Sequence, residues 1–193
     1  MSELRVERVG GQGDGVARDA QGRLVFVPLT LADETVEAEL KGDRAEVARL
    51  IEASPERVTP PCPNFGVCGG CSLQHWAAAP YADWKSDLIR QSLAREGIES
   101  EIMPSFTVPP GSRRRVALHA RRVGREIVLG FKARRSWAVQ AIETCVIADP
   151  RIVAALPALR IVAKPFLEHP KSAPILHVTL TATGLDVDVT GVE

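Results

Sequence analysis

The sequence predicts a mainly β protein with an α/β part: a small closed five-stranded barrel, then a cysteine-bearing loop, then a small α+β domain. Three observations lead to this prediction. Apolar and polar residues alternate with period two through about the first fifty residues. A connector rich in proline, glycine and cysteine follows at residues 54–79. One helical stretch and further alternating stretches fill the rest, so we expect domains at residues 1–54, 55–79 and 80–193.

The first domain is expected to hold five short strands. We place them at residues 4–9, 16–19, 24–27, 35–40 and 45–51. Three glycines, Gly11, Gly13 and Gly15, separate the first two strands. Their spacing also suggests a nucleotide-binding loop, but no helical pattern follows them, which favours a bent hairpin. Five strands of this length predict a small closed barrel.

One helix is expected directly after the connector. Pro80 suits a first helical turn, and Gly97 is typical of the residue that follows a helix. The apolar side chains that fall on one face of this helix are Tyr81, Trp84, Leu88, Ile89 and Leu93. We interpret the helix, together with Trp76 and Trp84, as packing elements rather than as surfaces that stack on nucleic-acid bases.

The last third of the chain predicts two hairpins with a short helix between them. Period-two alternation returns at residues 116–131 and again at residues 175–190, and each stretch contains a glycine turn. Asp149 and Pro150 predict the start of a short helix, which Pro157 interrupts. These elements make up the predicted α+β domain.

Basic residues are concentrated in one segment, although the whole chain carries no net charge. Residues 1–59 hold eight basic and twelve acidic side chains, a net charge of −4, whereas residues 112–135 hold nine basic and one acidic, a net charge of +8. So many neighbouring cations repel one another unless something negative offsets them, which favours a nucleic-acid phosphate backbone over a solvated sheet face. The candidate contacts are Arg113, Arg114, Arg115, Arg121, Arg122, Lys132, Arg134 and Arg135. Strand alternation sends neighbouring arginines to opposite faces, which leaves open that one set pairs with carboxylates of the acidic barrel.

Four cysteines form the pattern Cys62-x5-Cys68-x2-Cys71, with Cys145 far downstream. Three thiolates within ten residues can reach one inorganic centre, and the glycines among them permit a tight backbone path. This three-plus-one distribution favours a [4Fe-4S] cluster. Structural zinc, which usually pairs two short Cys-x2-Cys motifs, remains the alternative.

Disulfides are not expected in this chain. The N-terminus carries charges where a signal peptide needs an apolar stretch, which indicates a reducing, cytoplasmic compartment. We also expect no membrane partner, because no apolar stretch is long enough to span a bilayer.

Two adjoining segments resemble the cluster-binding stretch of the bacterial RNA uridine-C5 methyltransferases: residues 54–60 (SPERVTP) and 62–75 (CPNFGVCGGCSLQH). The leading barrel resembles a TRAM domain, an OB-like RNA-binding module. Further segments that resemble the family are residues 81–85, 113–115, 129–132 and 143–145. A TRAM module joined to a cluster is typical of the family's 23S ribosomal RNA branch. One departure is the sequence LADE at residues 31–34, where the TRAM module commonly has a Pro-Gly-Glu turn.

The resemblance implies a [4Fe-4S] cluster on Cys62, Cys68, Cys71 and Cys145, an RNA partner that is 23S rRNA, and S-adenosylmethionine bound in a C-terminal catalytic domain. The family's chemistry uses a cysteine nucleophile and a carboxylate base in that domain. Here each cysteine is already assigned to the cluster, and no strand, glycine turn and helix follow in order to hold the cofactor. We therefore expect no catalytic residue in this chain, but a monomeric fragment, inactive alone, that delivers RNA to a domain encoded beyond Glu193.

Two alternatives stay open at this point. A free-standing RNA-binding or redox iron-sulfur protein would carry the same features, and reversible reduction of the cluster would favour it. A radical S-adenosylmethionine methylthiotransferase also joins a TRAM module to a cluster. That chemistry uses Cys-x3-Cys-x2-Cys and leaves one iron open, whereas the first gap here is five residues and a fourth cysteine is present.

Overall fold

A computed structural model describes residues 1–169 and 171–192 of the chain. It divides into two compact units. The first unit comprises Met1–Pro60 and Ser72–Thr107, and the second comprises Pro61–Cys71 and Val108–Glu193. The cysteine loop therefore belongs to the second unit, although residues of the first unit flank it on both sides in the sequence.

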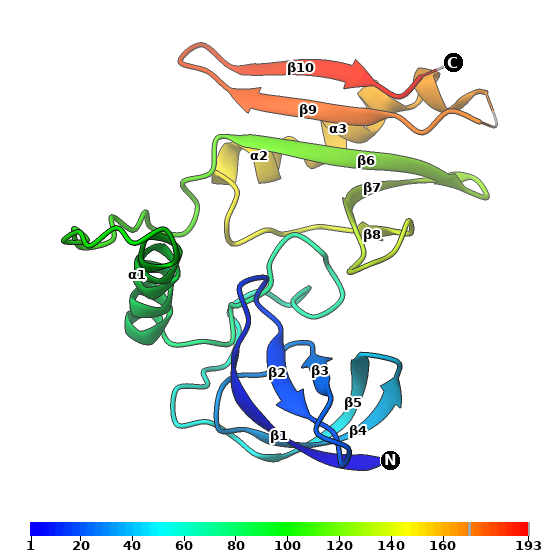
Figure 1. Cartoon of the computed structure of the whole chain (residues 1–193). Helices are drawn as coiled ribbons and strands as arrows, with labels where there is room; N and C mark the ends of the chain where they lie inside the picture. The colour runs from blue at the N-terminus through cyan, green and yellow to red at the C-terminus, as the bar shows by residue number, and fades with distance from the viewer. Residues whose placement is uncertain (170, 193) are drawn as a thin grey trace. The chain divides into compact units, whose positions relative to one another are not determined.

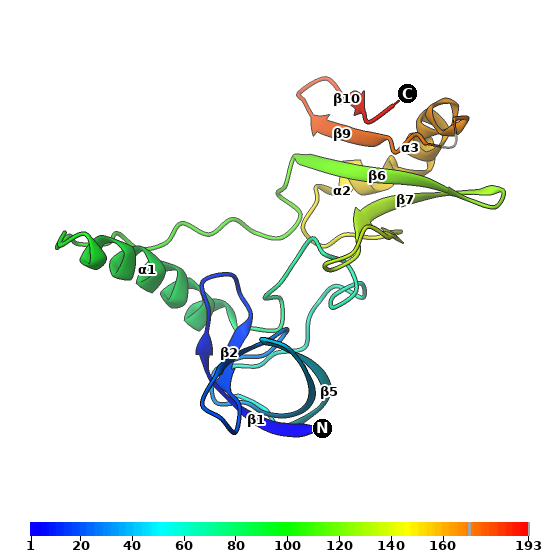
Figure 2. The same ribbon diagram turned by 45° about the vertical axis from the view of Figure 1, so that its right-hand side comes forward.

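The first unit is built on a closed five-stranded barrel. Its strands are β1 (Ser2–Val9), β2 (Gly15–Arg18), β3 (Leu24–Val27), β4 (Thr35–Lys41) and β5 (Arg44–Glu52). They follow the order β1-β2-β3-β5-β4, and β4 pairs with β1 to close the ring that Figure 2 shows. All neighbours are antiparallel except β3 and β5, which are parallel. The predicted barrel is confirmed, and its closed five-stranded form fits an OB-like TRAM module.

Alternation along the strands explains why this barrel forms. Inward-facing side chains such as Leu4, Val6 and Val25 are almost completely buried and form one core cluster. The pairing of β1 with β2 shifts register after Val6, and such bulges add the curvature that a small barrel needs to close. The glycine cluster between β1 and β2 is a tight turn, in which Gly13 has a φ of 84°. The bent-hairpin interpretation of these glycines is confirmed.

One helix, α1 (Ala78–Arg95), completes the first unit. It begins at Ala78, so Pro80 lies in its first turn, as the sequence predicted. The rings of Trp76, Tyr81 and Trp84 lie 5.6 to 6.0 Å apart between centroids and pack beside Val9 and Leu31 of the barrel. Both tryptophans are therefore packing elements, as the sequence predicted.

The second unit is a five-stranded antiparallel sheet covered by helices on one face. The strands are β6 (Arg115–Val123), β7 (Glu126–Lys132), β8 (Val139–Ala141), β9 (Ile175–Leu180) and β10 (Leu185–Thr190). Their order is β10-β9-β6-β7-β8, and Figure 1 shows α2 (Pro150–Ala154) and α3 (Leu156–Ala163) behind the sheet, followed by the short 3-10 helix η1 (Pro165–Leu167). Both predicted hairpins are confirmed. Pro157 lies in the first turn of α3, so it starts a second helix where the sequence predicted only an interruption.

The two faces of this sheet differ in chemistry. Val116, Leu118 and Ala120 of β6 are buried in the core with the helices. The alternate residues of β6 point to the other face, because side chains along a strand alternate. That face carries the cations discussed below.

Among the residues that the structure describes, no helix is both long enough and apolar enough to cross a membrane.

Candidate metal centre and basic face

The cysteine loop is attached to the end of β7 by backbone hydrogen bonds. Cys68 forms an isolated antiparallel bridge with Ala133. The Gly69 N–H donates to the Lys132 carbonyl at 2.9 Å, and the Arg134 N–H donates to the Val67 carbonyl at 2.8 Å. These bonds fix the middle of the loop on the edge of the second unit's sheet.

The same loop also reaches the segment that carries the fourth cysteine. The side-chain amide of Asn64 donates to the backbone carbonyl of Thr144 at 3.4 Å. Thr144 directly precedes Cys145 in the sequence. Two separate contacts therefore bring the cysteine triplet and Cys145 into one region of the second unit.

The other three thiols affect the ionisation of Cys68. Burial raises the pKa of the Cys68 thiol, and a hydrogen bond from the Gly70 N–H to its sulfur opposes this. Nearby thiols raise the pKa further, because a second negative charge would repel a Cys68 thiolate; they belong to Cys71, Cys145 and Cys62. A cation shared by these sulfurs would remove that repulsion.

Backbone N–H groups are directed at two of the sulfurs. The Gly70 N–H lies 3.4 Å from the Cys68 sulfur, and the Ala148 N–H lies 3.5 Å from the Cys145 sulfur. Donors of this kind stabilise thiolates and tune the potential of iron-sulfur clusters. All four cysteines are free thiols and half-buried, so they remain available as ligands.

The thiols do not yet form a finished coordination sphere. Within residues 1–169 and 171–192, no group of three or more His, Cys, Asp or Glu side chains is arranged to hold a metal ion. The number and type of the sulfurs, their mutual repulsion and their N–H donors fit a thiolate-ligated group.

Gly69 lies close against the backbone at the end of β7. A Cβ at this position would lie 2.9 Å from the Lys132 carbonyl oxygen and 3.3 Å from that of Ala133, and both are backbone atoms. We expect Gly69→Ala to lower the free energy of unfolding by about 1–3 kcal/mol and to speed alkylation of the cysteines. Thermal unfolding and thiol-labelling rates would measure this.

Gly70→Ala is the matched control for this substitution. Its Cβ would lie 3.5 Å from the Cys68 sulfur, which is ordinary contact. Equal effects of the two substitutions would show that the close approach at Gly69 is not what holds the loop.

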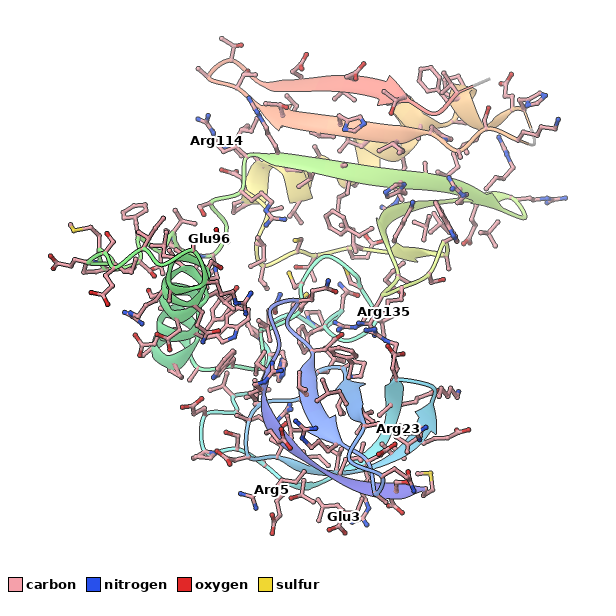
Figure 3. All side chains as sticks on the ribbon, in the orientation of Figure 1. Glu3, Arg5, Arg23, Glu96, Arg114 and Arg135 are labelled. Atoms are coloured by element: carbon pink, nitrogen blue, oxygen red, sulfur yellow. The ribbon has the colours of Figure 1, made fainter. Side chains whose placement is uncertain are left out.

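The eight candidate basic residues form three groups in the second unit. Arg113, Arg114 and Arg115 lie at the start of β6, Arg121 and Arg122 lie near its end, and Lys132, Arg134 and Arg135 lie where β7 ends and the next loop begins. Figure 3 labels Arg114 and Arg135 and shows that they lie apart. The structure thus does not gather all eight at one point.

Strand register decides which cations share a face. Arg115 and Arg121 lie on the same side of β6 as His119, because residues two apart along a strand share a face. His119 pairs with Gly130 of β7, and Lys132 lies two residues after Gly130, so Lys132 is on this side as well. We call the side of the sheet that carries Arg115, His119, Arg121 and Lys132 the basic face. It is turned away from α2 and α3. Burial lowers the pKa of His119, and Lys132, Arg121 and His177 lower it further, so the positive charge of this face comes from lysine and arginine.

Two of the candidates point elsewhere. Arg122 donates through Nε to the Leu167 carbonyl of η1 at 3.2 Å, which places it on the helix side of the sheet. Arg114 lies near Asp149. Hydrogen bonds from Arg151 are the main cause that lowers the pKa of Asp149, and the charge of Arg114 contributes. Part of the charge of Arg114 is therefore offset within the protein.

One exposed aromatic residue beside the basic face was not singled out from the sequence. Trp137 is 80% exposed, and the Nζ of Lys132 lies 3.9 Å from its ring centroid. The segment KARRSW at residues 132–137 interleaves cations with an aromatic ring. Aromatic rings interleaved with cations are typical of sites that bind single-stranded nucleic acid, so this pattern could have identified Trp137 from the sequence.

The comparisons with known proteins agree with the resemblance seen in the sequence. An uncharacterized RNA methyltransferase of Caulobacter vibrioides is 60% identical over 195 residues, which is 100% of this chain and 47% of the relative. Another from Mesorhizobium japonicum is 42% identical over 188 residues, 97% of this chain and 45% of the relative. The 23S rRNA (uracil(1939)-C(5))-methyltransferase RlmD of Halomonas elongata is 37% identical over 166 residues, 82% of this chain and 34% of the relative. No protein-family model matches the chain.

The chain spans about half the length of the curated relatives that match 97–100% of it. Identity of this extent over the whole chain means common descent and a shared fold for the matched region. The expected resemblance to bacterial RNA methyltransferases is confirmed, and the relatives that the chain matches include 23S rRNA (uracil(1939)-C(5))-methyltransferases. By sequence, the chain is a homologue of bacterial RNA methyltransferases over about half of their length.

Proposed function

We propose that this chain is the RNA-binding, iron-sulfur part of an S-adenosylmethionine-dependent RNA (uracil-C5) methyltransferase that acts on 23S rRNA. The observation that carries the proposal is the placement of a cationic sheet face and all four cysteines in one unit, where the cysteine loop is hydrogen-bonded to the end of β7 and to Thr144. The names of the relatives supply the reaction and the RNA. We assign no catalytic residue and no S-adenosylmethionine contact to these 193 residues, and in this proposal both lie in the part of the methyltransferase that the chain does not span.

In this proposal Cys62, Cys68, Cys71 and Cys145 hold a [4Fe-4S] cluster whose role is architectural. Between Cys71 and Cys145 lie 73 residues. Doubling a loop's length adds only about 0.6 kcal/mol to the free energy of closing it, whereas binding of a structural metal contributes about 10–16 kcal/mol in small zinc domains. Ligation would therefore fix the loop and the Cys145 segment on the sheet that carries the cations.

RNA binding is assigned to the basic face and the loop after β7. In this proposal Arg115, Arg121 and Lys132 contact phosphates, with Arg113, Arg134 and Arg135 beside them. Arg114 and Arg122 stay in the predicted set, but their partners at Asp149 and Leu167 make them weaker contributors. Base identity would be read on single-stranded or splayed nucleotides, as is usual for RNA.

Salt dependence tests the phosphate contacts directly. Each phosphate contact to single-stranded nucleic acid contributes about −0.7 to the slope of log K against log salt. We expect Arg115→Gln with Arg121→Gln to weaken RNA binding and to make that slope shallower by about 1.4. Fluorescence anisotropy with a labelled single-stranded RNA at several salt concentrations would measure both quantities.

Lys164→Gln serves as the control for lost charge, because Lys164 is exposed at the end of α3 on the helix side of the unit. It is expected to leave the slope unchanged. A wild-type chain whose RNA affinity does not change with salt would contradict the proposed function.

A further inference from the structure

Trp137 has a largely exposed side chain. The chain has three tryptophans, and the other two are packed against the barrel. Trp137 is 80% exposed and lies in the short loop between β7 and β8. Single exposed apolar side chains are normal on protein surfaces, so a binding role is argued from the cation against this ring and from the hollow that adjoins it.

Lys132 holds the Trp137 ring from one side. Its Nζ lies 3.9 Å from the ring centroid, well inside the distance of about 6 Å at which a cation is attracted to an aromatic face. Because the ring is 80% exposed, most of its surface remains open on the side away from Lys132. The contact favours this orientation of the ring, which reduces the entropy lost on binding.

A surface hollow of about 370 Å³ adjoins this pair, and Lys132 lines it. Its other lining residues are Gly69, Gly70, His119, Phe131, Ala133, Arg135 and Ser136. The hollow combines an aromatic wall, a histidine, a hydroxyl and two cations. Small-molecule sites of about 300–1,000 Å³ are commonly built from such apolar surfaces with a few polar groups.

We propose that Trp137 stacks on an unpaired RNA base, while the hollow beside it accepts the neighbouring nucleotide. This inference rests on the proposed RNA-binding function. It deepens that function because it names Trp137 as the side chain that makes the protein bind single-stranded RNA more tightly than duplex RNA. Aromatic side chains next to cations bind single-stranded nucleic acid through base stacking combined with phosphate contacts. In this arrangement Lys132 and Arg135 contact the phosphates that flank the stacked base.

Charge favours RNA over an apolar protein surface as the partner of Trp137. Between residues 127 and 142 the chain carries Lys132, Arg134 and Arg135 and no acidic residue. An apolar protein surface that covered the ring would also have to remove water from Lys132, whose Nζ lies 3.9 Å from the ring centroid. An RNA strand supplies a base for the ring and phosphates for the cations together.

The test compares Trp137→Ala and Trp137→Phe with wild type in binding to a short labelled oligouridine and to duplex RNA of equal length. Stacking contacts removed by alanine typically weaken binding by about five- to 150-fold. We expect about a tenfold loss for Trp137→Ala on the single strand, less than about twofold on the duplex, and an unchanged salt slope because no charge is removed. Trp137→Phe is expected to retain most of the affinity, since it keeps an aromatic face.

Ile161→Ala is the matched control, because Ile161 is an apolar residue of α3 that is 73% exposed on the helix side of the unit. It is expected to change nothing. An unaltered single-strand affinity for Trp137→Ala, in a chain that binds RNA with a clear salt dependence, would overturn the stacking role and leave the proposed function standing. Equal losses on single strand and duplex would also overturn it.

Two further outcomes separate the remaining explanations. A fall in the melting temperature of Trp137→Ala without any change in RNA affinity would mean that the ring packs against protein, and the inference would be wrong. If wild type shows no salt-dependent RNA binding, the proposed function fails and the inference fails with it.

Discussion

Replacing Cys145 by serine is expected to abolish metal binding and to cause the largest loss of stability of any single substitution in the second unit. Serine has nearly the same shape but is a poor ligand for iron or zinc. Structural metal binding contributes about 10–16 kcal/mol in small zinc domains, so loss of occupancy should exceed the effect of an ordinary side-chain deletion. Metal analysis and thermal unfolding of anaerobically purified protein would show it.

The neighbouring substitution Thr144→Ser is the control for the Cys145 variant. It keeps the backbone carbonyl that accepts the hydrogen bond from Asn64 and leaves all four thiols in place. Metal content and melting temperature should then equal those of wild type. If Cys145→Ser also retained wild-type metal content, melting temperature and RNA affinity, the architectural role of the centre would be wrong.

The second large effect is expected at Glu34, whose side chain is completely buried in the first unit. Its carboxylate accepts hydrogen bonds from the Arg57 guanidinium, including one at 2.7 Å from a terminal nitrogen to Oε2. It also accepts the N–H groups of Leu31 and Ser54 at 2.9 and 3.2 Å. Glu34→Gln leaves the Arg57 guanidinium, whose side chain is 24% exposed, without its counter-charge, and is expected to lower the free energy of unfolding by up to about 3–5 kcal/mol. Denaturant unfolding followed by circular dichroism would measure this loss.

Acidification should show the same interaction in the wild-type chain. Burial alone would raise the pKa of Glu34, but the hydrogen bonds from Arg57, Leu31 and Ser54 outweigh burial and hold the pKa below its usual value of 4.5. A carboxylate whose pKa is lower in the folded state than in the unfolded state stabilises the folded state at pH values above the unfolded-state pKa. This stabilisation is lost as the pH falls through the folded-state pKa. The stability difference between wild type and Glu34→Gln should therefore shrink below pH 4.5.

Asp33→Asn provides the control for the Glu34 variant. It breaks the ion pair between Arg5 and Asp33, which spans 3.3 Å with side chains 69% and 72% exposed. Exposed pairs of this kind contribute about 0–1 kcal/mol, so this variant should stay close to wild type. Similar losses for Asp33→Asn and Glu34→Gln would contradict the role given to burial.

Local sequence patterns were sufficient to predict most of the fold. Period-two alternation placed all five barrel strands and both hairpins of the second unit, because burial on one face of a strand imposes that pattern. The parallel pairing of β3 with β5 was beyond such reasoning, since strand order depends on contacts between distant segments. The sequence also did not predict that residues 72–107 belong to the same unit as the barrel. This association rests on Trp76, Tyr81 and Trp84 packing beside Val9 and Leu31.

The candidate site was predictable to a lesser extent. The spacing of Cys62, Cys68 and Cys71 predicts a shared ligand locally, but only the bonds from the loop to Lys132 and Thr144 show how Cys145 is brought near. Strand alternation predicted that the arginines divide between two faces, and the bond from Arg122 to Leu167 shows one that faces the helices. Trp137 was missed because a single aromatic residue is usually a core residue. Its contact with Lys132 depends on a loop conformation in which Arg135 has a φ of 51°.

The proposed architecture of the second unit depends on one inorganic centre shared by its four cysteine thiols. Anaerobic absorbance spectroscopy with iron and sulfide analysis of the wild-type chain tests it most directly. We expect a broad band near about 400 nm and about four iron and four sulfide per chain, all lost in Cys145→Ser. A colourless protein with one zinc per chain, or one with no bound metal, would contradict the iron-sulfur centre.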